Sequence, residues 1–310
     1  MRDKRRRMKI TDHDYSNTDE EYHEICAFLN RLSAQDPFMH WESGRMNFWR
    51  HGVHANKARE AQFFRDNVHL WRSDAHEIVG LCISEYGKDD IFIEVLPAYR
   101  GIYADIFAWI NNHWAATRTT IEIDVFSGDT EKIRLLEAQG FSFAYHFENK
   151  RTYDLERMDL GYTLEAGFSI QSFSESLDFA RRVALVQSAF DNPAYTENNL
   201  RGLMASPDYV AAYDLVVVAP DKQQVAYCIG WPEQTADDKG YIEPVGTHAA
   251  FRRRGFAKAV IQECFARMRA NGIRTVEIAS RAEPAVANYL YDALSPQTKR
   301  EVHKYAKAVD

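Results

Sequence analysis

The sequence has few cysteines and no long apolar run, and each shortage excludes a class of protein. Its four cysteines in 310 residues show neither the spacing of a zinc site nor a disulfide framework. We therefore expect no metal site and a reducing, cytoplasmic setting. No stretch approaches the roughly 18 apolar residues of a membrane span, so a soluble protein without a membrane partner is expected.

Positive charge is also scarce. Lys and Arg number 38 against 45 Asp and Glu, which gives a formal net charge of −7. A long basic surface is not expected in such a chain, so nucleic acid is not an expected partner. The basic opening at residues 2–7 lacks the apolar run that follows it in a signal peptide, and we expect a frayed tail.

The chain is long enough for two domains, and an internal repeat predicts two. The strand-like residues 121–123 recur as residues 276–278, and at the same offset Leu136 stands where Tyr291 stands. In each half the pattern predicts helices, followed by a hairpin, a third strand, a long helix, a strand, a helix and a last strand. We expect an α/β fold with two tandem domains, each a mixed, mainly antiparallel sheet flanked by helices. The expected domains are residues 1–160 and 161–310.

One junction in the second half suggests chemistry. A strand around Val245 runs through a short basic loop at residues 252–254 into a helix that begins beside Gly255 and ends at Gly272. The first turn of a helix presents unpaired N–H groups and the positive end of its dipole, and a glycine lets a ligand approach the backbone closely. The loop therefore predicts a pyrophosphate site. It is neither a P-loop nor the dinucleotide-binding fingerprint, because the spacing of both is absent.

The residues around this loop resemble the GNAT superfamily of acyl-coenzyme-A-dependent N-acyltransferases over most of the second half. That family marks its coenzyme loop with Arg/Gln-x-x-Gly-x-Gly/Ala, which Arg252, Gly255 and Ala257 match. The resemblance implies acetyl-CoA as co-substrate, its diphosphate held by the loop and its pantetheine amides paired with the strand edge. The implied coenzyme-binding residues are Val245, Gly246, Thr247, Arg252, Arg253, Arg254, Gly255, Phe256, Ala257 and Lys258.

Acyl transfer to an amine needs a neutral nucleophile, a stabilised oxyanion and a proton for the departing thiolate. The resemblance implies a tyrosine acid in a pattern like A-x-x-L-Y, and Tyr291 fits it, with a packed helix tyrosine as the alternative. The implied oxyanion donor is a backbone N–H near Thr247. Glu243 shares strand parity with Val245 and Thr247, so it is predicted to face the same side and act as base. A solvated or ion-paired glutamate is the alternative, and His248 is a weaker candidate base.

The first half keeps the frame of the junction without its chemistry. Arg100-Gly101 precedes a helix, yet Tyr103 stands where the family has glycine, and Leu136 replaces the tyrosine. We predict a degenerate domain that binds no coenzyme, because the phenol fills the phosphate space. The aromatic residues 38–41 either line an acceptor cleft or pack against helices, and packing is the commoner use.

The predicted activity is transfer of an acetyl group from acetyl-CoA to a primary amine of a small molecule. Two alternatives stay open: a non-catalytic acyl-CoA-binding sensor or scaffold, and a protein or peptide N-acetyltransferase. The sequence departs from the family's usual residues at Glu283-Pro284 and Ser295-Pro296, both on the acceptor side. The acidic charge favours cationic acceptors.

Overall fold

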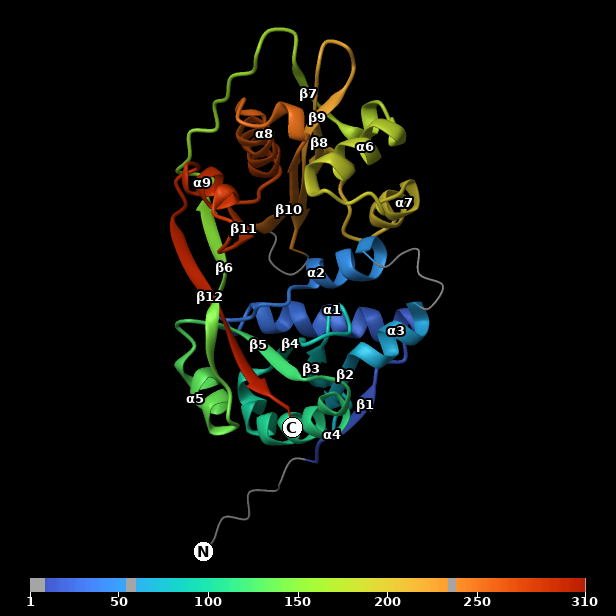
Figure 1. The fold of residues 1–310 in the computed structure, drawn as a ribbon, viewed down its shortest axis with the longest axis vertical. Coiled ribbons are helices and arrows are strands. Elements are labelled where there is room, and N and C mark those ends of the chain that lie inside the picture. Colours follow the sequence, from blue (N-terminus) through green and yellow to red (C-terminus); the bar gives the residue numbers. More distant parts are fainter. Residues whose placement is uncertain (1–8, 54–59, 234–237, 310) are drawn as a thin grey trace, which may run out of the picture. The chain divides into compact units, whose positions relative to one another are not determined.

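The computed structural model describes residues 9–53, 60–233 and 238–309, and the basic opening at residues 2–7 lies outside them. The chain forms two compact units, whose elements are drawn in Figure 1. Unit 1 consists of Met1–Met46, Lys57–His146 and Val302–Asp310, and unit 2 of Asn47–Asn56 and Phe147–Glu301. Among the described residues, none of the helices has the length and apolar character that crossing a bilayer requires.

Unit 1 is built on a mixed sheet. Its strands are β1 (Thr11–Asp14), β2 (Val68–Arg72), β3 (Ile78–Ile83), β4 (Asp90–Val95), β5 (Thr120–Phe126) and β12 (Thr298–Ala308). Its helices are α1 (Asp19–Ser33), α2 (Ser43–Asn47), α3 (Glu60–Asn67), α4 (Tyr103–His113) and α5 (Thr130–Ala138), with the shorter η2 (Pro97–Ile102) and η3 (Ala115–Thr117). The strand order is β1-β2-β3-β4-β5-β12, and neighbours are antiparallel except β4 and β5.

Unit 2 repeats this plan. Its strands are β6 (Ser142–Asp154), β7 (Ser169–Ser172), β8 (Asp214–Val218), β9 (Gln224–Pro232), β10 (Lys239–Thr247) and β11 (Thr275–Arg281). Its helices are α6 (Phe179–Phe190), α7 (Glu197–Met204), α8 (Phe256–Ala270) and α9 (Val286–Asp292), with the shorter η1 (Phe48–Val53), η4 (Phe173–Glu175), η5 (Ala211–Tyr213) and η6 (Ala249–Phe251). The strand order is β6-β11-β10-β9-β8-β7, and only β10 and β11 run parallel.

Helices cover both faces of the unit 2 sheet (Figure 1). Alternate residues of β8 face opposite sides, so Leu215 packs into the cluster under α8 whereas Val216 packs against α6 and α7. The spacing of apolar residues in α8 places residues such as Val260 and Phe265 in the same cluster as Leu215. These strands can be buried on both faces because their residues are continuously apolar. Their packing fixes the position of β10, which leads to the predicted loop.

The last strand of each sheet comes from the other half of the sequence. β6 follows α5 of unit 1 but pairs antiparallel with β11, whereas β12 follows α9 of unit 2 and pairs with β5. The mixed sheets and the predicted order of elements from the hairpin onward are confirmed, although a strand, β1 or β7, precedes the helices of each unit. The compact units are not the continuous segments 1–160 and 161–310. Hydrophobic periodicity identifies a strand but not the edge it joins, because β5 and β11 offer the same backbone groups.

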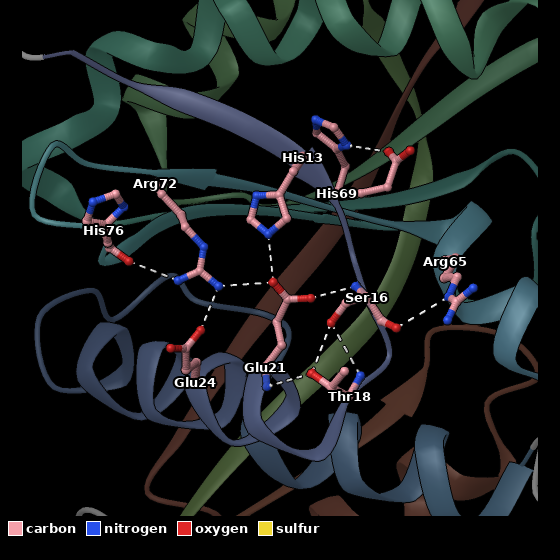
Figure 2. Close-up of polar contacts among 10 residues, drawn as sticks. His13, Ser16, Thr18, Glu21, Glu24, Arg65, His69, Arg72 and His76 are labelled. Atoms are coloured by element: carbon pink, nitrogen blue, oxygen red, sulfur yellow. Dashed lines mark hydrogen bonds and ion pairs between the residues drawn. The ribbon is translucent and has the colours of Figure 1, made fainter.

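Polar contacts fasten the first strand of unit 1 to its neighbours (Figure 2). The ring of His69, buried on β2, lies 2.7 Å from the carboxylate of Asp14 on β1. On α1, Glu21 lies 2.6 Å from the ring of His13 and accepts a hydrogen bond from Arg72 at 3.0 Å. Burial raises the pKa of Glu21, but these hydrogen bonds outweigh it and lower the pKa to about 2. Charged contacts therefore hold α1 against the sheet.

Candidate active site

β10 and β11 separate partway along their length. They pair in parallel only at residues 239–241, whereas β10 continues to Thr247 and stays paired with β9 on its other side. Among the described residues, no strand pairs with the β11-facing edge of β10 beyond Tyr241. That edge, which includes residues 245–247 of the predicted site, offers backbone groups that an extended ligand can bind as an added strand.

A bulge interrupts β10 where the strands part. The register with β9 shifts between Ile242 and Val245, and Pro244 within the bulge has no N–H to give to a ladder. Ile242 and Val245 are three positions apart, yet both pack against the cluster under α8, so the alternation of faces changes phase. Strand parity therefore does not place Glu243 on the face of Val245 and Thr247, because parity does not hold through a bulge, and that placement stays a prediction.

Gly255 turns the loop into α8. Its φ of +82° lies in the left-handed region, and a Cβ at this position would meet nothing within 4 Å. No side chain of the described residues caps the first turn of α8. The N–H groups of residues 256–258 are therefore left for an anion, at the positive end of the helix dipole.

The loop is anchored to the C-terminal end of α6. Arg252 donates to the carbonyl oxygen of Ala189 at 2.9 Å, and the N–H of Ala249 donates to the Ser188 hydroxyl at 3.0 Å. Nothing in the sequence marks this contact, because the small residues of α6 carry no motif. Arg252, which matches the family pattern, thus positions the loop through a backbone carbonyl.

The other two arginines of the loop differ in their partners. Arg254 pairs with Glu165 through Nε at 2.8 Å and also through Nη2, so a carboxylate already neutralises its charge. Arg253 is exposed and has no hydrogen-bond or ion-pair partner among the described residues. Lys258, in the first turn of α8, is likewise exposed. Arg253 and Lys258 therefore supply the uncommitted positive charge beside the helix start.

A cavity of about 550 Å³ lies beside α8. Lys258 and Gln262 of α8 contribute to its wall. The remaining lining residues come from the end of β6, from the segment after it and from the turn between α9 and β12: Asp154, Arg157, Met158, Asp159, Gly161, Ala293, Leu294, Ser295 and Gln297. The cavity thus adjoins the helix start through Lys258.

Tyr291 lies on α9 with its ring in the core of unit 2. The residue is 7% exposed and packs in the cluster under α8, and among the described residues its hydroxyl has no hydrogen-bond partner. Burial raises the pKa of Tyr291, and repulsion from the Glu243 carboxylate acts in the same direction. The phenol is therefore neutral, and the two predicted catalytic residues are close enough to interact electrostatically.

The two candidate bases have different hydrogen bonds. Glu243 is exposed, and its main-chain carbonyl accepts a hydrogen bond from the Trp231 indole at 2.6 Å, which fixes the backbone of the bulge. The Nδ1 atom of His248 accepts from the N–H of Ala250 at 3.3 Å and so caps η6. His248 therefore has only its second ring nitrogen left for chemistry.

In unit 1 a pair of parallel strands also separates, but other residues lie between the two strands. β4 and β5 pair only over the first two residues of β4. Beyond that point residues 38–41 bridge the strands: the N–H groups of His40 and Trp41 donate to Glu94 on β4 at 3.0 and 2.9 Å. The His40 ring lies 3.1 Å from Asp124 on β5. The aromatic stretch therefore packs inside unit 1 and connects the two strands that part.

The helix after β4 also begins differently. η2 runs directly into α4, and the N–H of Tyr103 donates to the carbonyl of Arg100. The residue before α4 is Ile102, with a φ of −81°, in place of a glycine. The helix starts align Ile102 with Gly255 and Tyr103 with Phe256, one position from the predicted correspondence. The backbone of this turn is thus already bonded within unit 1.

The side chains at this second helix start are also engaged within unit 1. Tyr103 is buried and its ring stacks on Phe107, 6.0 Å between centroids, so it packs inward and does not stand in an open phosphate space. Arg100 pairs with Asp36 at 2.9 Å and with Glu131. Its charge is therefore neutralised by two carboxylates, unlike that of Arg253 in unit 2.

Comparison with known proteins gives one family match. Residues 185–293, which run from within α6 to the end of α9, match the Acetyltransferase (GNAT) family. The matched segment contains β10, the loop, α8 and Tyr291. No curated protein sequence matches the chain.

Solved structures match the chain over nearly its whole length. A tandem GNAT protein from the clavulanic acid biosynthesis pathway has a TM-score of 0.69 at 14% identity, covering 97% of this chain and 99% of that one. A GCN5-related N-acetyltransferase from Sphaerobacter thermophilus has a TM-score of 0.62 at 19% identity, covering 97% and 96%. A GNAT-family acetyltransferase from Colwellia psychrerythraea has a TM-score of 0.63 at 10% identity, covering 96% and 100%. Residues 185–293 thus match the GNAT acetyltransferase family, and the chain has the fold of a tandem GNAT protein over nearly its whole length.

Proposed function

We propose that unit 2 transfers an acetyl group from acetyl-CoA to a primary amine of a small molecule. The observation that carries the proposal is the parting of β10 from β11 beside an uncapped helix start at Gly255. The amide groups of the pantetheine arm pair with the free edge at residues 245–247. The diphosphate lies at the N–H groups of residues 256–258, with Arg253 and Lys258 neutralising its charge. The adenosine end extends toward the cavity beside Lys258.

The proposed reaction is direct attack of the neutral amine on the thioester carbonyl. The new C–N bond forms as the carbonyl oxygen becomes an oxyanion, which the backbone N–H near Thr247 stabilises. Glu243 takes the proton of the ammonium, directly or through a water. The C–S bond then breaks, and Tyr291 gives its proton to the thiolate. Burial keeps the Tyr291 phenol protonated, as an acid in this step must be.

We also propose that unit 1 binds no coenzyme. Residues 38–41 connect β4 and β5 where unit 2 leaves an open edge. Arg100 is held by Asp36 and Glu131, and Ile102 stands in place of the glycine that admits a phosphate. Each difference removes one part of a coenzyme site, and Leu136 in place of a tyrosine removes the acid.

A thiol-release assay with acetyl-CoA tests the activity. The amines are polyamines, aminoglycosides, lysine analogues and a peptide with a free N-terminus, since the net charge of −7 favours cations. We expect release with a small amine, and Tyr291→Phe lowers kcat roughly 100- to 1,000-fold with little change in the KM for acetyl-CoA. Tyr289→Phe, on the same helix but 75% exposed, is the matched control and stays near wild type.

The same assay separates the alternatives. Release only with the peptide assigns the enzyme a protein acceptor. Coenzyme binding by calorimetry without thiol release for any amine identifies a sensor and contradicts the proposed reaction. A Tyr291→Phe variant as fast as wild type contradicts the role of the phenol.

A further inference from the structure

A buried arginine on β6 holds the helix that carries Tyr291. Arg151 has no exposed surface. Its Nε donates to Oδ1 of Asp292 at 2.6 Å, and its Nη2 donates to Oδ1 of Asn288 at 2.7 Å. Its Nη1 donates to the Ser280 hydroxyl on β11 at 3.0 Å. One guanidinium therefore joins β6, β11 and α9.

Asn288 extends this network to the turn between β11 and α9. Its Oδ1 also accepts from the Ser280 hydroxyl at 2.9 Å and from Asn149 at 3.1 Å. Its Nδ2 donates to the carbonyls of Arg281 and Ala282 at 2.8 and 3.0 Å. The residue that Arg151 holds thus fixes the backbone that leads into α9.

Tyr291 lies between the two residues that Arg151 holds on α9. Asn288 is one helical turn before it and Asp292 directly follows it. The guanidinium carbon is 5.9 Å from the Tyr291 ring centre, and Tyr153, also on β6, donates to the Tyr291 carbonyl at 2.9 Å. A helix of 7 residues has little stability of its own, so contacts with the sheet set its position.

We propose that Arg151 is a positioning residue for acetyl transfer, holding α9 so that the Tyr291 hydroxyl reaches the sulfur of the coenzyme. The inference rests on the proposed function of unit 2. Arginine suits this place because its planar fork donates to two acceptors in fixed directions, whereas a lysine ammonium is a single point of attachment. Arg151 precedes residue 161, so the second half of the sequence alone does not contain it.

The test replaces Arg151 by lysine, which keeps the charge and loses the fork. Lys299→Met is the matched control, because Lys299 also pairs with Asp292, at 3.2 Å from the exposed side. For Arg151→Lys we expect kcat for thiol release to fall roughly 10- to 100-fold, as for a misplaced catalytic group, with the KM for acetyl-CoA unchanged. Lys299→Met stays near wild type.

A double-mutant comparison separates positioning from general damage. In a Tyr291→Phe background, Arg151→Lys is expected to cause no further loss of kcat, because its effect acts through the missing hydroxyl. The same fold-loss in both backgrounds overturns the proposal. If Arg151→Lys does not fold, Asp292→Asn, which keeps the shape of the side chain, is expected to give the same dependence on Tyr291.

A measurement without turnover distinguishes failure of this inference from failure of the proposed function. The NMR signal of isotope-labelled Tyr291, assigned by its loss in Tyr291→Phe, is expected to shift in Arg151→Lys and to stay in place in Lys299→Met. An unchanged signal in Arg151→Lys overturns the positioning role. A shifted signal in a protein that releases no thiol with any amine supports the contact and contradicts the acetyl-transfer proposal alone.

Discussion

In both units a pair of parallel strands separates at the same point of the fold, but the residues at the gap differ. In unit 2, within the part of the chain that the structure describes, no strand pairs with the β11-facing edge of β10 beyond Tyr241, and the chain passes through Gly255 into a helix without a side-chain cap. In unit 1 His40 bridges β4 and β5, and η2 leads directly into α4. The fold therefore supplies the gap twice, whereas a few residues decide whether a ligand can enter it.

The two units also differ in the charge at the helix start. The arginine at the helix start of unit 1, Arg100, is neutralised by Asp36 and Glu131, whereas Arg253 in unit 2 has no partner among the described residues. An anion that approaches the helix start of unit 1 meets an arginine whose charge is already neutralised by an ion pair. An anion approaching unit 2 meets free positive charge and free N–H groups.

The largest expected effect comes from separating unit 2 at the wrong residue. A fragment of residues 161–310 lacks β6, so the β11 edge loses its partner, and Asp292 loses the Arg151 ion pair. We expect no cooperative thermal unfolding transition by circular dichroism. The fragment 147–301, which retains residues 147–154 of β6 but like 161–310 lacks the Asn47–Asn56 segment of unit 2, is the control and is expected to unfold cooperatively. A sharp transition for 161–310 near that of the full chain contradicts the strand exchange.

A second prediction concerns the two glycines at the ends of α8. Gly255 and Gly272 have φ values of +82° and +89°, and a Cβ at either would meet nothing within 4 Å. Replacing either by alanine is expected to cost about 1–2 kcal/mol of unfolding free energy. Only Gly255→Ala is expected to raise the KM for acetyl-CoA, by about tenfold, since the methyl keeps the diphosphate from a charged hydrogen bond. Equal KM values for the two variants contradict the site.

A smaller effect is expected from the arginines. Arg253→Gln weakens acetyl-CoA binding about two- to fivefold at low salt and less at high salt, because the charge is exposed and screened. Arg100→Gln leaves coenzyme binding unchanged and lowers the stability of unit 1, since Asp36 and Glu131 lose their partner. Calorimetry with acetyl-CoA at two salt concentrations checks both. Weaker binding in Arg100→Gln shows that unit 1 takes part.

The smallest expected effect is an unchanged rate at alkaline pH. An acid acts in its protonated form, which exists below its pKa, so the raised pKa of Tyr291 extends the active range upward. We expect kcat to stay constant up to pH about 10, the ordinary pKa of tyrosine. The measurement is a kcat profile of wild type against Tyr291→Phe. A decline with a midpoint below that pH, absent from the variant, contradicts the raised pKa.

The local features of the site could be predicted from the sequence, whereas contacts between segments far apart in the sequence could not. The spacing of apolar residues and Gly272 predicted the helix seen as α8, which ends at Ala270. Arg151, which contacts α9, and Glu165, which contacts the loop, come from segments far away in the sequence, and no local pattern marks these contacts. Pro244 could have revealed the bulge, because proline within a central strand is typical of one, and strand parity does not extend from Val245 to Glu243 through a bulge.

A crystal structure with acetyl-CoA at saturating concentration tests the central claim most directly. The predicted result is one coenzyme per chain, its pantetheine arm along residues 245–247 and its diphosphate at the first turn of α8, with residues 38–41 still joining β4 and β5. Coenzyme density at the start of α4, or none in either unit, would contradict the account.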